Sequence, residues 1–125
     1  MVTRLIAGVV LGVWLAGAAA ALEAGAGKAE ITPELGTPLA GYYQRMGCGA
    51  VSIRDPLWVR ALYLDDGATR VLLVSADLFA ITPDLREAVL ERAPKDVPRQ
   101  NIILTATHTM TGPGGMVRPL VFRLF

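Results

Sequence analysis

The run "VLLVSA" (Val71–Ala76) decides the fold that this sequence predicts. Because the run is apolar or small on both of its alternating faces, it predicts a central strand that is covered on both sides. The strand is expected to extend over Arg70–Ala76. Trp58–Leu64 before it is also strand-like, and "DDGAT" (65–69) joins the two runs. An Asp-Gly pair between two strand-like runs predicts an antiparallel hairpin.

A helix is predicted directly after this strand, over Thr82–Ala93. Thr82 suits the N-cap, and Pro83 suits the first helical position because its missing N–H is not needed there. Asp84 complements the positive end of the helix dipole. Pro94 cannot continue a helix and is expected to end it.

The run "NIILTAT" (101–107) predicts one more strand after the helix. A strand, a helix and a strand in this order form a crossover, so the last strand should lie parallel to Val71–Ala76 in the same sheet. The predicted fold class is therefore α/β, with a mixed sheet made of a β-hairpin followed by a βαβ crossover.

A short strand and a long loop are predicted before the hairpin. Lys28–Ile31 alternates polar and apolar residues and is expected to end at Pro33. Residues 34–56 are rich in Gly and Pro, and loops longer than about 15 residues are usually functional or disordered. Tyr42 and Arg45 lie in this loop, which favours a binding loop over a linker. The alternative is an ordered surface loop whose tyrosines pack for support.

The first 21 residues have the features of a secretory signal peptide. Arg4 supplies the positive start, Leu5–Leu15 the apolar core, and Ala18–Ala20 the small residues of a cleavage site. The alternative is an uncleaved anchor, because Leu5–Leu22 approaches the length of about 18 residues that a membrane helix needs. Either interpretation predicts an exported protein, secreted or periplasmic.

Composition excludes several classes of protein. The chain has 125 residues and a net charge of +1, so no charge imbalance points to a nucleic-acid partner. One histidine and one cysteine exclude a self-contained zinc finger or a disulfide framework. Cys48 is a weak candidate nucleophile because the chain has no second histidine to activate it.

The single histidine follows a strand. In α/β sheets, ligands bind outside the carboxyl ends of parallel strands, and His108 lies at such an end. Asp77 lies at the end of the neighbouring strand, so the two residues should be close together. Both are site candidates, with Asp77 expected to support the site residue and not to bind a ligand itself. The alternative is a histidine that hydrogen bonds at a strand terminus and an aspartate that braces a turn.

The loop after His108 is rich in glycine. Gly112, Gly114 and Gly115 are expected to leave amide groups uncovered, and such groups can hold an anion or an oxyanion. A Gly-Pro-Gly sequence is also typical of a simple turn.

Three stretches in this order resemble the N-terminal part of the neutral/alkaline non-lysosomal ceramidase family. They are "AGAGKAEITPELGTPLAGY" (24–42), "DPLWVRALYLDDGATRVLLVSADLFAIT" (55–82) and "NIILTATHTMTGPGG" (101–115). The resemblance implies an exported zinc amidohydrolase that cleaves the amide of N-acylsphingosine, a ceramide-like lipid, to sphingosine and a fatty acid. It also implies that residues 22–115 are an incomplete N-terminal portion of a larger catalytic domain. Association with a membrane surface is a further expectation, and the oligomeric state stays open.

The resemblance also assigns site residues. Family members typically carry Thr-His-Thr-His-Ser-Gly-Pro where this chain has Thr-His-Thr-Met-Thr-Gly-Pro (107–113). It implies that His108 is a zinc ligand and that Met110 replaces a second histidine that would assist proton transfer. In an extended chain, residues two apart point to the same side, so Met110 is expected to keep the direction and lose the chemistry. The glycines named above would shape the edge of the pocket, and Tyr42 and Arg45 would contact substrate.

The end of the chain departs from the family. By resemblance, the other zinc ligands (a His, a Glu and a Tyr) lie far downstream, whereas this sequence ends in "MVRPLVFRLF" (116–125), which we expect to be an irregular tail. A fragment, or a reading frame that is shifted or stops early, is the expected explanation. No residue of this chain is assigned a catalytic role, and the chain alone is expected to bind zinc weakly or not at all and to lack amidase activity.

Two alternatives stay open. One is a degenerate, non-catalytic secreted module that binds lipid or a partner. The other is a family member that acts on a different amide or ester, because family resemblance indicates the metal chemistry better than it indicates the substrate.

Overall fold

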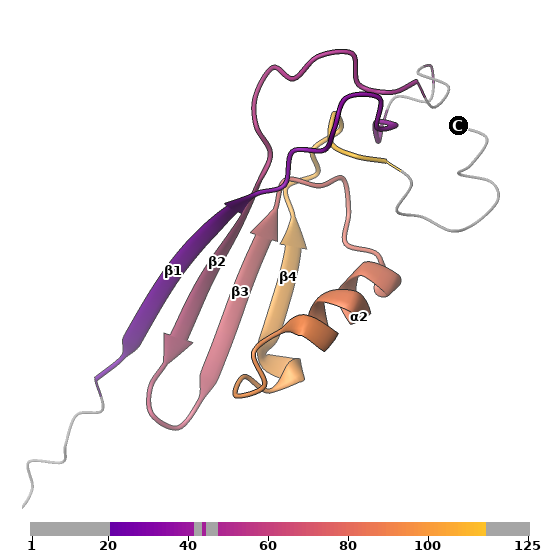
Figure 1. Cartoon of the computed structure of the whole chain (residues 1–125). Helices are drawn as coiled ribbons and strands as arrows, with labels where there is room; N and C mark the ends of the chain where they lie inside the picture. The colour runs from indigo at the N-terminus through magenta and orange to yellow at the C-terminus, as the bar shows by residue number, and fades with distance from the viewer. Residues whose placement is uncertain (1–20, 42–43, 45–47, 115–125) are drawn as a thin grey trace, which may run out of the picture.

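The computed structural model describes residues 21–41, 44 and 48–114 (Figure 1). The described part forms a four-stranded sheet in the order β1-β2-β3-β4 with one helix against it. The elements are β1 (Glu23–Glu30), β2 (Trp58–Asp65), β3 (Arg70–Ala76), α2 (Pro83–Arg92), the short 3₁₀ helix η3 (Arg99–Asn101) and β4 (Ile102–Ala106). Among these residues, no helix has both the length and the apolar character needed to cross a membrane. The predicted signal peptide up to residue 20 and the predicted tail at 116–125 lie outside the described residues.

The strand directions confirm the predicted α/β class. β1 pairs with β2 and β2 pairs with β3 in antiparallel fashion, whereas β3 and β4 are parallel. The hairpin turn forms where the Asp-Gly pair predicts it. The Asp65 carboxylate accepts a hydrogen bond from the Gly67 amide at 2.8 Å, and Gly67 has a φ of 84°, which glycine adopts without steric cost. The sheet is therefore mixed, with a hairpin followed by a crossover.

The crossover helix α2 begins and ends where local chemistry predicts. The hydroxyl of Thr82 accepts a hydrogen bond from the Leu85 amide at 3.2 Å, and Pro83 is the first helical residue. Ala93 has extended backbone angles at the C-cap, directly before Pro94. Because proline restricts the residue before it to extended conformations, the helix ends there.

The buried core lies between α2 and one face of the sheet. Its centre is formed by Leu90 of α2, Val97 of the following loop and Ile102 at the start of β4. Leu90 is 2% exposed and is the most deeply buried large side chain of the described residues. The half-buried side chains Tyr63, Leu72, Ala93 and Leu104 pack against this centre. Burial of this apolar surface holds the helix on the sheet.

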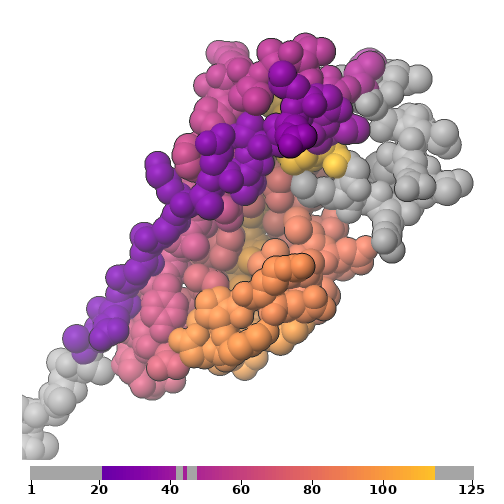
Figure 2. Space-filling view, in the orientation of Figure 1, coloured from indigo at the N-terminus to yellow at the C-terminus, as the bar shows by residue number. Residues whose placement is uncertain are grey.

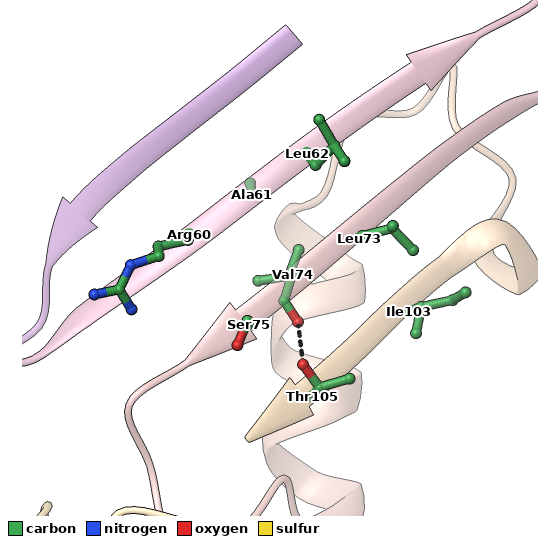
Figure 3. A pocket seen from close by; sticks show the side chains of 8 residues that line it. All are labelled: Arg60, Ala61, Leu62, Leu73, Val74, Ser75, Ile103 and Thr105. Carbon is green, nitrogen blue, oxygen red and sulfur yellow. Dashed lines mark hydrogen bonds between the residues drawn. The ribbon is translucent and has the colours of Figure 1, made fainter. Parts of the chain in front are cut away.

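The opposite face of the sheet is open in the described part of the chain. It carries a depression of about 350 Å³ (Figure 3), lined by Arg60, Ala61, Leu62, Leu73, Val74, Ser75, Ile103 and Thr105. Leu62 is 38% exposed and Ile103 is 49% exposed. The prediction that β3 is covered on both sides is therefore wrong for the described residues. The crossover supplies one helix, which covers one face, and the described residues of the long loop lie beyond the ends of the strands (Figures 1 and 2).

Strand β1 is longer than the sequence predicts. It begins at Glu23, five residues before Lys28, and runs to Glu30. Its first residues include glycine and alanine, which have low strand propensity. Eight consecutive residues nevertheless pair with β2, from Glu23 opposite Asp65 to Glu30 opposite Trp58. Pairing with a regular neighbour therefore outweighs the intrinsic preference of the β1 residues.

The loops after β1, β3 and β4 meet at one end of the sheet (Figure 1). The loop between β1 and β2 folds back on itself through an isolated bridge between Pro38 and Gly49. A second bridge joins Leu39 to Pro113, so this loop contacts the segment that follows β4. The end of the sheet where β3 and β4 finish is therefore the place where distant parts of the sequence come together.

Candidate functional site

The segments that follow β3 and β4 continue side by side past the ends of the strands. The Thr107 amide donates to the Ala76 carbonyl at 3.0 Å, and the Thr109 amide donates to the Leu78 carbonyl at 2.9 Å. The two strand ends are thus neighbours, as the crossover predicts. His108 lies between these two anchored residues.

The imidazole of His108 has a defined partner on one side only. Its Nδ1 lies 3.1 Å from the Phe79 carbonyl oxygen, and the two rings are in tilted contact, with centroids 4.5 Å apart and planes at 36°. Because a carbonyl oxygen only accepts hydrogen bonds, Nδ1 carries the proton and the Nε2 of a neutral ring is left with a lone pair. Within the described residues nothing hydrogen bonds to Nε2, and the side chain is exposed. A histidine that hydrogen bonds at a strand terminus, the alternative given above, has the same bond, and this bond leaves Nε2 available to a metal.

The backbone of His108 is in the left-handed region, with a φ of 59°. Among the described residues it is the one non-glycine residue with a positive φ. Such a conformation is uncommon for a residue with a side chain and is found at sites where the surrounding structure fixes it.

Asp77 anchors the polar side of the site. Its Oδ2 accepts a hydrogen bond from the Trp58 amide at 2.9 Å and pairs with Arg60 Nη1 at 3.2 Å. Its Oδ1 accepts from the Thr107 hydroxyl at 3.2 Å. The Trp58 amide first, and then Arg60 and Thr107, hold the pKa of the Asp77 carboxyl below its ordinary value. The direct partner of His108 is Phe79, and Asp77 contacts the segment that carries His108 through the Thr107 hydroxyl.

Met110 does not follow the geometry that the sequence predicts. β4 ends at Ala106 and Met110 lies in a turn, so the premise of an extended chain from His108 to Met110 is wrong. The Met110 thioether packs against Gly41 of the long loop. A Cβ on Gly41 would lie 2.7 Å from Met110 Cε and 2.9 Å from its carbonyl oxygen. Gly41 therefore permits a close approach that any side chain would block.

The glycines after His108 are packed and hydrogen bonded. The Gly112 amide donates to the Thr109 carbonyl at 3.1 Å, and the Gly114 amide donates to the Pro38 carbonyl at 2.7 Å. The prediction of uncovered amides is therefore wrong for these two residues, because both amides hold the loop together. Gly115, together with Tyr42 and Arg45 of the long loop, lies outside the described residues.

His108 suits a metal, but the described residues do not complete a metal site. No group of three or more His, Cys, Asp or Glu side chains comes together in residues 21–41, 44 and 48–114. A catalytic zinc needs about three protein ligands. The donor chemistry of His108 thus fits one ligand of such a set. Cys48 is exposed and forms no disulfide bond.

Sequence reasoning missed two contributors to the site, Phe79 and Arg60. Phe79 acts through its ring and its carbonyl, and a carbonyl leaves no trace in a sequence. Phe79 could have been suspected from its position two residues after Asp77, because both residues lie in the loop that follows β3. Arg60 lies on β2, and its link to Asp77 depends on the register of Arg60 opposite Ser75.

The comparisons with known proteins agree on one family. The family model described as neutral/alkaline non-lysosomal ceramidase, N-terminal, matches residues 22–125. The chain is 31% identical over 106 residues to a neutral ceramidase of Pseudomonas aeruginosa, a match that covers 80% of this chain. It is 35% identical over 89 residues to a neutral ceramidase of Mycobacterium tuberculosis, a match that covers 68% of this chain.

Solved structures give the same result. A structure described as ceramidase complexed with C2 matches 82% of this chain with a TM-score of 0.67 and 29% identity. The crystal structure of neutral ceramidase from Pseudomonas aeruginosa matches 81% with a TM-score of 0.66 and 29% identity. These matches cover 17% of each solved chain, and the two sequence relatives are covered over 16% and 13% of their length. The chain belongs to the neutral/alkaline non-lysosomal ceramidase family, and it corresponds to the N-terminal part of that family.

Proposed function

We propose that this chain is the N-terminal segment of an exported, zinc-dependent amidohydrolase that cleaves N-acylsphingosine, and that the chain alone is inactive. Membership of the ceramidase family supports the reaction class and the lipid amide substrate. The observation that carries the metal role is the His108 ring, whose Nδ1 donates to Phe79 and whose Nε2 has a lone pair. Export is proposed from the features of residues 1–21 in the sequence.

In this proposal His108 would supply one of the nitrogen ligands of Zn²⁺. When bound, the ion would lower the pKa of a water molecule and polarise the amide carbonyl. The task of this chain's own residues is to present Nε2 at the carboxyl end of the sheet. Met110 supplies packing against Gly41 and no proton transfer, because a thioether has no proton to give.

A chimaeric enzyme tests this proposal. Residues 22–125 would replace the matching segment of the Pseudomonas aeruginosa neutral ceramidase, and hydrolysis of N-acylsphingosine and bound zinc would be measured. We expect low turnover, a rise of about 10²-fold or more with Met110→His, and loss of both zinc and turnover with His108→Ala. Lys95→Ala is the matched surface control and should leave both turnover and bound zinc unchanged. A folded chimaera with Met110→His that binds no zinc and hydrolyses nothing would contradict the proposal.

The isolated chain provides a second test of the proposal. Titration of the full chain with zinc should show weak or no binding, because one imidazole does not hold a catalytic zinc. One tight equivalent, abolished by His108→Ala, would show that the chain itself builds a complete site.

The non-catalytic alternative is favoured by Met110, which packs against Gly41 and has no proton to transfer. If the chain is a lipid-binding module, it should sediment with phosphatidylcholine vesicles that contain N-acylsphingosine, in the presence of chelator and without turnover. If it acts on another substrate, the chimaera should hydrolyse simple amides or esters faster than N-acylsphingosine.

A further inference from the structure

We propose that Asp77 and Thr107 are positioning residues that fix the tautomer and the orientation of His108 before any metal binds. This inference rests on the proposed role of His108 as a zinc ligand and deepens it. It adds that the ligand is set in place by a hydrogen-bonded chain that starts on the sheet.

The first step is the backbone around His108. The Thr107 amide is held by a hydrogen bond to Ala76, the last residue of β3, and the Thr109 amide by one to Leu78. His108, between them, has a φ of 59°. A left-handed histidine persists only where its neighbours determine the conformation. The imidazole then makes a tilted contact with the Phe79 ring and donates from Nδ1 to the Phe79 carbonyl.

The second step is the hydroxyl of Thr107, which links the two sides of the turn. It lies 2.7 Å from the Thr109 hydroxyl and 3.2 Å from Asp77 Oδ1. The carboxylate can only accept, so Thr107 donates to Asp77 and accepts from Thr109. One continuous chain of donors thus runs from Thr109 through Thr107 to Asp77.

The third step is the anchor of that chain. Asp77 is bonded to the Trp58 amide and paired with Arg60, and both partners belong to β2. The Asp77 side chain is 17% exposed, so water competes little for its oxygens. The turn that carries His108 is therefore fastened to the second strand of the sheet as well as to the third.

The experiment uses the full chain without metal. His108 is the only histidine in the sequence, so its imidazole nitrogens give unambiguous signals in a long-range ¹H–¹⁵N correlation spectrum. At mildly alkaline pH, where imidazoles are neutral, we expect the Nδ1–H tautomer to dominate. A free histidine favours the opposite tautomer, with the proton on Nε2. Thr107→Val and Asp77→Asn should each shift the population clearly towards Nε2–H.

Thr105→Val is the matched control. Thr105 lies two residues earlier on β4, and its hydroxyl donates to the Val74 carbonyl at 3.2 Å. Thr107 has a similar contact with the Ala76 carbonyl at 3.4 Å, but it also contacts Asp77 and Thr109. The difference between the two valine variants therefore isolates the hydrogen-bonded chain. Thr107→Ser, which keeps the hydroxyl, should restore the spectrum of the unchanged protein.

The outcomes separate this inference from the proposed function. An unchanged tautomer in Thr107→Val, with backbone amide signals of a folded chain, would overturn the positioning role. An equal shift in Thr105→Val would overturn it as well. Because the spectrum is recorded without metal, a chimaera that fails to bind zinc would refute the proposed function and leave the tautomer result intact.

Discussion

The two faces of the sheet are held by different forces. On the face covered by α2, Leu90, Val97 and Ile102 form a buried apolar centre. On the other face, Leu62 and Ile103 are exposed within the described chain. At the carboxyl ends of β3 and β4, hydrogen bonds and the Arg60–Asp77 ion pair hold the chain in place. Stability of the fold and positioning of His108 are therefore expected to respond to different substitutions.

The largest expected effect is on the covered face. Leu90→Ala removes a side chain that is 2% exposed and leaves a cavity, so we expect a loss of about 3 kcal/mol in the free energy of unfolding. Leu62→Ala makes the same chemical change at a side chain that is 38% exposed, and its cost should be far smaller. Urea unfolding of both variants measures the difference. Equal losses would mean that the two faces are buried to the same extent in solution.

The next effect concerns how the Asp77 carboxylate makes the stability of the fold depend on pH. Its pKa is lowered in the folded state, so its contribution to stability is complete above the ordinary carboxyl pKa of about 4. That contribution is lost as the pH falls through the lowered value. Asp77→Asn should reduce stability at neutral pH, by less than Leu90→Ala does, and should flatten the decline in stability between about pH 5 and pH 2.

Unfolding curves at a series of pH values measure this effect. Part of the acid dependence should persist in the Asp77→Asn protein, because the pKa values of Asp65 and Asp66 are also lowered, mainly by Arg70 and by the Thr69 amide respectively. Parallel stability profiles for the variant and the unchanged protein would argue against a stabilising role of the Asp77 charge.

The smallest effect is expected on the open face. Ile103→Thr keeps a β-branched side chain at a position that is 49% exposed, and the change in unfolding free energy should stay within about 0.5 kcal/mol. A loss above 2 kcal/mol in the full chain would show that this face is covered after all. The measurement is urea unfolding under the same conditions as for Leu90→Ala.

The elements with local signals could be predicted from the sequence. Thr82, Pro83 and Pro94 define the ends of α2, and the Asp-Gly pair defines the hairpin. The parallel pairing of β3 and β4 follows from the crossover. The extent of β1 and the open face could not be predicted, because both depend on what lies next to a strand. An apolar outer face on β3 predicts a cover, but the strand's own sequence does not say which segment supplies it.

Only part of the site could be predicted, because the rest depends on contacts with distant segments. The proximity of Asp77 to the segment that carries His108 follows from topology. The positive φ of His108, the Phe79 carbonyl and the packing of Met110 on Gly41 do not, because each depends on backbone positions set by a distant loop. The extended-chain premise failed at His108 because the strand ends two residues earlier.

The left-handed backbone at position 108 also bears on how this chain would respond to protein engineering. Glycine adopts that conformation freely, so His108→Gly should relieve a local penalty. A selection for heat resistance alone would then tend to remove the imidazole. The histidine is a place where stability and the proposed chemistry compete for the same residue.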